Sequence, residues 1–159
     1  MIGVTSVSGP HLLAVFESEQ GGIFTVDSIT SRDDGITWGD RRRVYTPTGS
    51  NNNAGAPQVI NVGGTLVVSF MTDEDTQQHH WIDGASAKLI TSGNGGRTWG
   101  NKILVGPVQS NWPGLVDLNE RRFLMMFDHG GAMAQGLTFS GLEVDVTITD
   151  AASVDIVVS

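Results

Sequence analysis

The chain has 159 residues and a formal net charge of −8 at pH 7, with 39% hydrophobic and 16% charged residues. This acidic balance argues against nucleic acid or an anionic membrane as a partner, because both are bound through clustered Lys and Arg. There are no cysteines, which excludes a disulfide framework and a thiolate zinc site. No apolar run approaches the about 20 residues that span a bilayer, and Leu12–Phe16 lacks the basic flank of a signal peptide.

The 21 glycines, well above the roughly 7% typical of proteins, predict many short strands joined by tight turns. No segment has the three-and-four spacing of an amphipathic helix, so the predicted fold class is all-β. The first group of expected strands is Ile2–Val7, Leu12–Ser18, Ile23–Thr30 and Arg42–Tyr45. The second group is Ala56–Val62, Leu66–Thr72, Ala85–Thr91 and Lys102–Val105. The third is Gly114–Leu118, Phe123–Phe127, Met133–Phe139 and one or two strands within Leu142–Ser159.

Two sequence repeats connect these groups. The pattern Ser-x-Asp-x-Gly-x-Thr-Trp occurs at 31–38 and again at 92–99, 61 residues later, with Asn94 in place of Asp in the second copy. Apolar runs that end at Phe16, Phe70 and Phe127 recur at intervals of 54 and 57 residues. A unit of this length suits one four-stranded blade of a β-propeller better than a solenoid repeat.

The repeated turn is an Asp box, and its residue types are explained by what a tight turn needs. Asp33 and Asn94 can accept hydrogen bonds from backbone amides two residues on, while Gly35 and Gly96 permit a positive φ. The serines add side-chain hydrogen bonds, and each Trp is expected to bury its ring between strands. We therefore assign a structural role to Ser31, Asp33, Gly35, Trp38, Ser92, Asn94, Gly96 and Trp99.

Several further sequence segments resemble those of one known family. They are Ala56-Pro57-Gln58-Val59-Ile60, Phe70 to Asp75, Asn111-Trp112-Pro113-Gly114-Leu115, and the segment from Phe127-Asp128-His129-Gly130-Gly131 to Gln135. Together they resemble the C-terminal half of glycoside hydrolase family 93, the fungal exo-1,5-α-L-arabinanases, over residues 11 to about 137.

This resemblance implies a sialidase-like propeller of six blades, of which the chain would form two to three: a blade at 1–50, a blade at 56–106 and a partial blade at 112–159. At roughly 60 residues per blade the whole ring would need about 360 residues, so we expect the chain to be a truncated form whose natural N-terminus is missing. The open ends of such a fan would expose sheet edges for self-association.

The resemblance also implies an activity: exo-acting release of arabinobiose from α-1,5-arabinan with retention of configuration. The expected partner is a plant cell-wall oligosaccharide or polysaccharide, the expected location of the parent protein is extracellular, and no cofactor is expected. Three alternatives stay open, namely a non-catalytic Asp-box module that binds carbohydrate or serves as a scaffold, a sialidase-like hydrolase, and an inactive remnant of the enzyme. Sialic acid is disfavoured because Arg32 and Arg97 lie inside Asp boxes rather than in a carboxylate-binding triad.

Retaining glycosidases use two carboxylic acids about 5 Å apart. Glu17 is the candidate nucleophile, since it follows the strand ending at Phe16 and resemblance gives a strand-end Glu this role. Glu19 shares its face of the strand and is the competing candidate. The resemblance implies a Tyr near position 127 that supports the nucleophile. This chain has Phe127 there, and a Phe has no hydroxyl group.

The acidic run at 73–75 includes Glu74, a candidate substrate-binding residue. Repulsion among its three carboxylates could raise the pKa of one of them, which would suit a general acid. Asp128 and His129 follow the third repeat strand and could bind sugar hydroxyls. Trp81 is expected in a loop as an exposed stacking platform, whereas Trp112 is expected in a loop and to pack in the core. The adjacent pair His79-His80 lacks ligand spacing, so no metal site is predicted.

Overall fold

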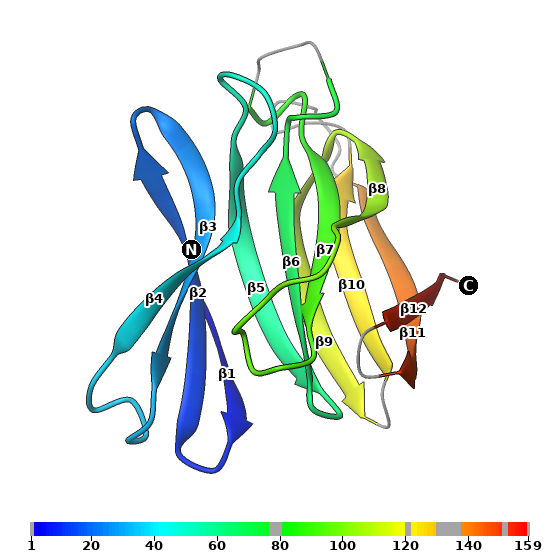
Figure 1. Cartoon of the computed structure of the whole chain (residues 1–159). Helices are drawn as coiled ribbons and strands as arrows, with labels where there is room; N and C mark the ends of the chain where they lie inside the picture. Colours follow the sequence, from blue (N-terminus) through cyan, green and yellow to red (C-terminus); the bar gives the residue numbers. More distant parts are fainter. Residues whose placement is uncertain (1, 77–80, 120–121, 130–137, 151–152, 159) are drawn as a thin grey trace.

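The computed structural model describes residues 2–76, 81–119, 122–129, 138–150 and 153–158. In this part of the chain all regular elements are strands, arranged in three antiparallel four-stranded sheets that stand next to one another like blades (Figure 1). The predicted all-β class with four-stranded antiparallel blades is confirmed. The described residues include no helix that is long and apolar enough to cross a membrane.

The first sheet has the order β1-β2-β3-β4, and each neighbouring pair is antiparallel. Alternating and blocked apolar residues form these strands as predicted, with ends that extend by up to three residues. Leu13, Val15 and Val26 are fully buried, whereas most of the fourth strand is exposed. The strands are β1 (Ile2–Ser8), β2 (His11–Gln20), β3 (Ile23–Ser31) and β4 (Gly39–Tyr45).

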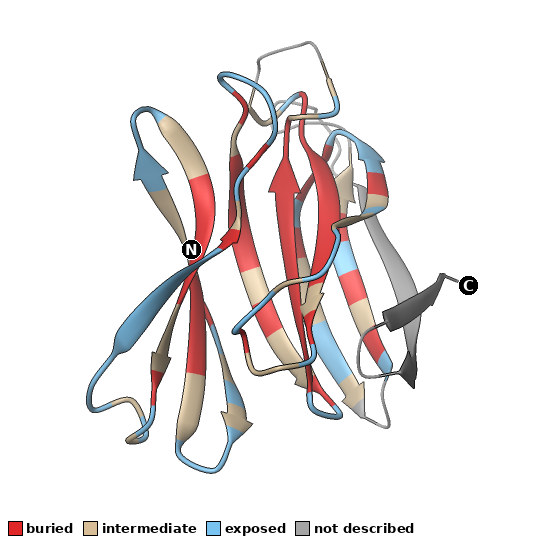
Figure 2. Cartoon of the chain, in the orientation of Figure 1, coloured by how far each residue is buried: buried red, intermediate tan, exposed pale blue. Residues whose placement is uncertain are grey.

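The second sheet has the order β5-β6-β7-β8 and contains the most deeply buried strands (Figure 2). Every residue of its second strand is buried, because sheets pack against both of its faces. This explains why its sequence is a continuous apolar block instead of an alternating pattern. The strands are β5 (Ala54–Val62), β6 (Thr65–Thr72), β7 (Ser86–Ser92) and β8 (Ile103–Val108).

The third sheet has the order β12-β11-β10-β9. A strand at Met133–Phe139 was predicted, but the strand paired with β10 runs from Thr138 to Asp150, and residues 133–137 lie outside the described part. The alternating stretch from Leu142 to Ile148 belongs to this one long strand. The strands are β9 (Ser110–Asn119), β10 (Arg122–His129), β11 (Thr138–Asp150) and β12 (Ser153–Val158).

The strand connections divide the molecule into two opposite faces. We call the face with connections 20–23, 45–54, 72–76 with 81–86, and 108–110 the loop face. The Asp-box face carries connections 8–11, 31–39, 62–65 and 92–103. Because successive antiparallel strands reverse direction, alternate connections of one blade fall on opposite faces.

The sheets are held together at the seam between the first two blades. Buried side chains from both sheets form one cluster, with Leu13 and Val15 on β2 facing Val59, Val68 and residues near them. The inner strands β1 and β5 come very close, since a Cβ added to Gly3 would lie 2.9 Å from the Val59 amide nitrogen. A second cluster, with Leu89 and Phe123, joins the second sheet to the third.

The two Asp boxes lie where predicted, between the third and fourth strands of their blades. They share the hydrogen bonds that the Ser and the Asp or Asn side chains accept from backbone amides, but Trp38 Nε1 donates to the Gly35 carbonyl at 3.0 Å, whereas Trp99 Nε1 has no partner among the described residues. The Ser31 hydroxyl accepts a bond from Gly35 N at 2.8 Å, and Ser92 accepts one from Gly96 N at 2.9 Å. Asp33 Oδ1 accepts a hydrogen bond from the Thr37 amide at 2.8 Å. In the second box, Asn94 Oδ1 accepts the equivalent bond from the Thr98 amide at 2.9 Å.

The two Asp-box tryptophans differ in burial. Each ring lies against the glycine of its own turn, with Trp38 Cζ2 and Trp99 Cζ2 both 3.6 Å from a Cβ built on that glycine. Trp99 is partly buried and also packs against the core cluster at the seam, whereas Trp38 is 39% exposed. The prediction that both rings are buried between strands is therefore wrong for Trp38, whose ring packs on its own turn and stays exposed.

We predict that Gly96→Ala destabilises the chain by about 3 kcal/mol, of which about 1–2 kcal/mol comes from a Cβ at positive φ and the rest from overpacking. Gly96 has φ +83°, and an added Cβ would collide with Cδ1 of the fully buried Leu13 in the first sheet. Urea unfolding at equilibrium measures the loss.

Gly35→Ala is the matched control, since Gly35 has φ +85° but the nearest atoms to its Cβ are 3.6 Å away. This variant should show only the backbone cost of about 1–2 kcal/mol. Equal losses for the two variants would contradict close packing of the second Asp box on the first blade.

Candidate functional site

The loop face brings together the side chains that the sequence marked as catalytic or sugar-binding. Glu17 lies near the end of β2, and Glu74 and Trp81 lie in the connection between β6 and β7. Asp128 and His129 are the last residues of β10, which also ends on this face. The propeller topology, rather than sequence proximity, places these residues on one side of the molecule.

Glu17 links the first blade to the inner strand of the second. It pairs with Val26 in the sheet and is partly exposed. Its Oε2 accepts a hydrogen bond from the backbone amide of Ala56 on β5, at 3.1 Å. The carboxylate is thus held by a rigid strand on one side and by a main-chain donor on the other, while no described contact occupies Oε1.

The amide that binds Glu17 belongs to a strained bulge. Ala56 has φ +51°, precedes Pro57, and lies where the pairing of β5 with β6 shifts between Gly55 and Gln58. A non-glycine residue in this region costs on the order of 1–3 kcal/mol, and such strain clusters at functional sites. Gly55 leaves room for the Glu17 carboxylate at this position, since an added Cβ would collide with Oε2 and displace it.

The same bulge recurs in the third blade. Trp112 also has φ +51°, precedes Pro113, and lies opposite a register shift in β10, 56 residues after Ala56. Its amide donates to Met71 Sδ at 3.4 Å. The sequence analysis missed this repeat, although two Xaa-Pro pairs at the blade interval were a usable signal.

Glu17, Met71 and Asp128 therefore occupy equivalent positions in successive blades, each directly after the Phe of the repeated strand. The first two accept a hydrogen bond from the bulge of the next blade. Asp128 Oδ1 is buried and has no hydrogen-bond partner among the described residues. Asp128 also lines a cavity of about 190 Å³ with Trp112, Met126 and others.

Asn111 is a further polar residue that the sequence analysis did not identify. It is fully buried on β9 opposite Asp128, and within the described ranges neither its Oδ1 nor its Nδ2 has a partner. Its place in the segment Asn111 to Leu115, which carries the family resemblance, was the signal that could have identified it. His129, next to Asp128, is partly buried.

Trp81 lies beside Glu17. A Cβ built on Gly55 would be 2.8 Å from Glu17 Cδ and 3.1 Å from Trp81 Cζ2, so the two side chains flank the same glycine. The indole is partly buried on a small cluster that includes Ala56 and Met71, and it stacks on Phe24 with ring centroids 6.3 Å apart. It is less open than the predicted platform, because part of the indole is buried against Phe24 and this cluster.

Trp112 differs from both predictions made for it. It lies on β9 rather than in a loop, and it is 45% exposed instead of packed in the core. The positive φ of the bulge turns this residue out of the regular strand alternation, which a period-two pattern does not reveal.

Glu74 joins loops of two blades and is not open to a substrate. Its side chain is 1% exposed, accepts bonds from the Tyr45 hydroxyl and from Thr48, and forms an ion pair with Lys102. Burial acts to raise the pKa of Glu74, but the bonds from Lys102, Thr48 and Tyr45 outweigh it and hold the pKa below its usual value. The predicted substrate contact would require these bonds to break.

The adjacent carboxylates are also used internally. Asp73 is 1% exposed and accepts the Asn53 amide at 2.6 Å. Asp75 forms an ion pair with the buried Lys88. Burial acts to raise the pKa of Asp75, but the hydrogen bonds from Lys88 and Ser86 have the larger effect, so the pKa lies below its usual value. Repulsion within this acidic run therefore does not create an acid with a raised pKa at Glu74 or Asp75, contrary to the prediction.

Within the described ranges there is no group of three or more His, Asp or Glu side chains that could hold a metal ion. His79 and His80 lie outside those ranges.

With this geometry established, the class of fold is clear: the sheets match parts of sialidase-like propeller glycoside hydrolases. No family model matches the sequence, and no curated protein sequence matches it. The fold comparison therefore stands on solved structures alone.

Three of these structures are glycoside hydrolases at low sequence identity. A family 117 glycoside hydrolase from Zobellia galactanivorans superposes with a TM-score of 0.65 at 10% identity, covering 98% of this chain and 54% of its own. The Penicillium chrysogenum α-L-arabinanase complexed with arabinobiose gives 0.60 at 15% identity, with 93% and 44% covered. The family 93 α-L-arabinofuranosidase of Fusarium graminearum with arabinobiose gives 0.60 at 12% identity, with 93% and 45% covered. The chain thus spans about half the length of the structures it matches.

We predict that Glu74→Gln lowers the free energy of unfolding by about 2–3 kcal/mol at pH 7, because it leaves Lys102 unpaired. The pKa of Glu74 in the folded state is lower than its ordinary value of 4.5. The ionised carboxylate therefore contributes its full stabilisation above pH 4.5, and this stabilisation is lost as the pH falls through the pKa of the folded state. The difference between wild type and variant should therefore shrink toward pH 3. Urea unfolding from pH 7 to pH 3 measures it.

Glu19→Gln is the control, since Glu19 is exposed and accepts a single bond from Gly22 N at 2.9 Å. It should change stability by no more than about 0.5 kcal/mol. Stability curves for wild type and Glu74→Gln that stay parallel over the whole pH range would contradict the assignment.

Proposed function

We propose that this chain is part of a carbohydrate-active propeller that acts on the ends of a plant cell-wall polysaccharide, with linear α-1,5-arabinan as the preferred substrate. The observation that carries the proposal is the Glu17 carboxylate, held beside Trp81 at a strained bulge on the loop face of a glycoside-hydrolase fold. Two structurally similar proteins were solved with arabinobiose, which supports this sugar.

In the proposed reaction Glu17 is the nucleophile of a retaining mechanism. Its carboxylate attacks the anomeric carbon while a second carboxylic acid protonates the leaving oxygen, and water then releases the sugar with retained configuration. The Ala56 amide orients Oε2, leaving Oε1 for the attack. The second acid is not assigned to the run at 73–75, whose members are buried or ion-paired.

The proposed product is arabinobiose, released from the chain end. Trp81 would stack on a sugar ring next to the attacked bond, because an indole face packs well on the apolar side of a sugar. We propose an extracellular location for the parent protein, where such a polymer is found.

A second candidate is a binding module without turnover. It is favoured by two observations: the Glu17 carboxylate already bonds a main-chain amide, and Phe127 has no hydroxyl to support a nucleophile. Both candidates use the same surface, so binding and turnover must be measured separately.

We predict that Glu17→Gln lowers arabinobiose release from linear arabinan by about three orders of magnitude or more, because an amide is not a nucleophile at the anomeric carbon. Chromatography of the released sugars measures the rate, and proton NMR of the first product reports its anomeric configuration.

Glu19→Gln, two residues along the same strand, is the control and should retain activity. Unchanged turnover in Glu17→Gln would remove Glu17 from the mechanism. Inverted configuration of the product would exclude a retaining reaction.

We predict that Trp81→Ala raises the dissociation constant for an α-1,5-arabino-oligosaccharide by about fivefold or more, through loss of the stacking surface. Isothermal titration calorimetry measures the affinity. Trp38→Ala removes an exposed indole on the opposite face and should leave it unchanged. Saturable binding without turnover in the wild type would select the binding module, and equal effects of both Trp variants would contradict a site at Trp81.

A further inference from the structure

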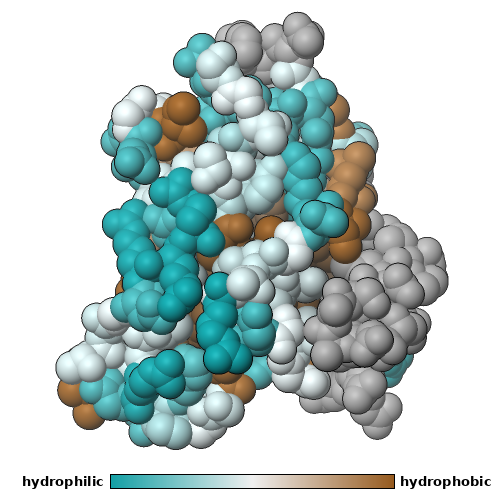
Figure 3. Space-filling view, viewed as in Figure 1, coloured by the Kyte–Doolittle hydropathy of each residue, from teal (hydrophilic) through white to brown (hydrophobic). Residues whose placement is uncertain are grey.

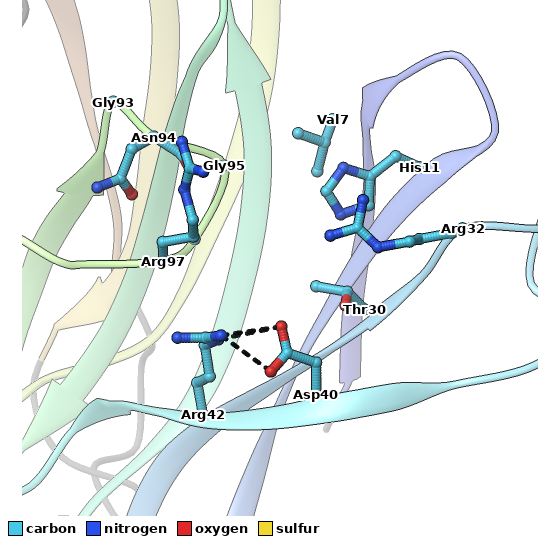
Figure 4. A pocket seen from close by; sticks show the side chains of 11 residues that line it. Val7, His11, Thr30, Arg32, Asp40, Arg42, Gly93, Asn94, Gly95 and Arg97 are labelled. Carbon is cyan, nitrogen blue, oxygen red and sulfur yellow. Dashed lines mark hydrogen bonds and ion pairs between the residues drawn. The ribbon is translucent and has the colours of Figure 1, made fainter.

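The Asp-box face has a pocket of its own, which lies between the first and second blades. Its volume is about 400 Å³, within the range of small-molecule sites. Figure 4 shows Arg97 on one side, His11 and Arg32 on the other, and Asp40 with Arg42 on β4 between them. Two blades contribute to the pocket, since Arg32 lies in the first Asp box and Arg97 in the second.

This pocket is separate from the loop face. His11 begins β2 and Glu17 lies near its other end. Six residues of an extended strand span about 20 Å, so a ligand in this pocket does not reach the Glu17 carboxylate. Binding in this pocket is therefore independent of the proposed arabinanase activity.

The charge of the pocket is opposite to that of the chain. Three guanidinium groups and one carboxylate line it, whereas the whole chain carries a net charge of −8. The surface over β4 is among the most hydrophilic in the view of Figure 3. An acidic protein that gathers three arginines in one concave site concentrates positive potential there.

Two arginines of the pocket, Arg32 and Arg97, differ from the arginines of β4 in their pairing. Arg41 and Arg43 pair with the buried Asp27, and Arg42 pairs with Asp40. Within the described ranges, neither Arg32 nor Arg97 has an ion-pair partner. Arg97 is held in place by a bond from its Nε to the Asn94 carbonyl at 3.1 Å, which leaves its terminal nitrogens available.

His11 adds a polar atom without a partner. Its Nε2 is buried, and no described residue forms a hydrogen bond with it. Because this nitrogen has almost no accessible surface, the His11 ring forms part of the pocket wall, and the arginines provide the groups that a ligand can contact.

We propose that this pocket binds an oxoanion group, either the carboxylate of an acidic sugar or a free sulfate. Planar guanidinium groups match the paired oxygens of carboxylates and sulfates, and such charge-assisted bonds are the strong ones. Arg32 and Arg97 approach the anion from two blades, while Arg42, partly neutralised by Asp40, forms the base. Binding would also link the two blades on the side away from the loop face.

The test uses the full chain with sodium glucuronate and sodium sulfate as probes, and glucose and sodium chloride at equal ionic strength as their controls. Isothermal titration calorimetry should show saturable binding of at least one anion. Arg32→Gln and Arg97→Gln should each weaken it by about tenfold. Asp40→Asn should tighten it, since it removes the carboxylate that competes for Arg42.

Arg41→Gln is the matched control, because it removes one guanidinium next to Arg42 on β4 but outside the pocket, and Arg43 still pairs with Asp27. It should leave binding unchanged. Preference for glucuronate would assign the site to an acidic sugar, and preference for sulfate to a free oxoanion. No saturable binding of either probe up to about 10 mM, or equal weakening in Arg41→Gln and Arg32→Gln, would overturn the proposal.

Discussion

The packing of the first blade against the inner strand of the second is the contact on which the rest of the structure depends. Gly3 lets β1 approach the backbone of β5, and fully buried side chains such as Leu13 and Phe70 fill the seam. One end of this seam brings Glu17 to the Ala56 amide. The other end brings the Arg32 and Arg97 turns around one pocket. A small slide of one sheet along the other would therefore alter both sites together.

Much of the fold could be predicted from the sequence, because the signals were local. Each Asp box contains its own hydrogen bonds, as Ser31 and Ser92 show, so its position between the third and fourth strands follows from the motif. The third blade was harder to predict. An apolar stretch around Met133 and the alternating residues after Leu142 were assigned to different strands, and period-two patterns do not show where one long strand begins.

The site was less predictable, since its contacts join residues far apart in the chain. The sequence identified Glu17 as a strand-end carboxylate, but its bond to Ala56 crosses between blades. Glu74 has the composition of a solvated acidic loop, yet Lys102 and Tyr45, distant in sequence, enclose it. The exposure of Trp112 depends on a positive φ that only the assembled bulge imposes.

The equivalent positions Glu17, Met71 and Asp128 have a consequence for how such proteins evolve. The bulge amide of the neighbouring blade requires only a lone pair, which a carboxylate or a thioether can both supply. Residue type at this position can thus drift by point mutation while the blade keeps its shape. Blades of one fold can therefore differ in chemistry at this position, with a carboxylate in one blade and a thioether in another, without any change of architecture.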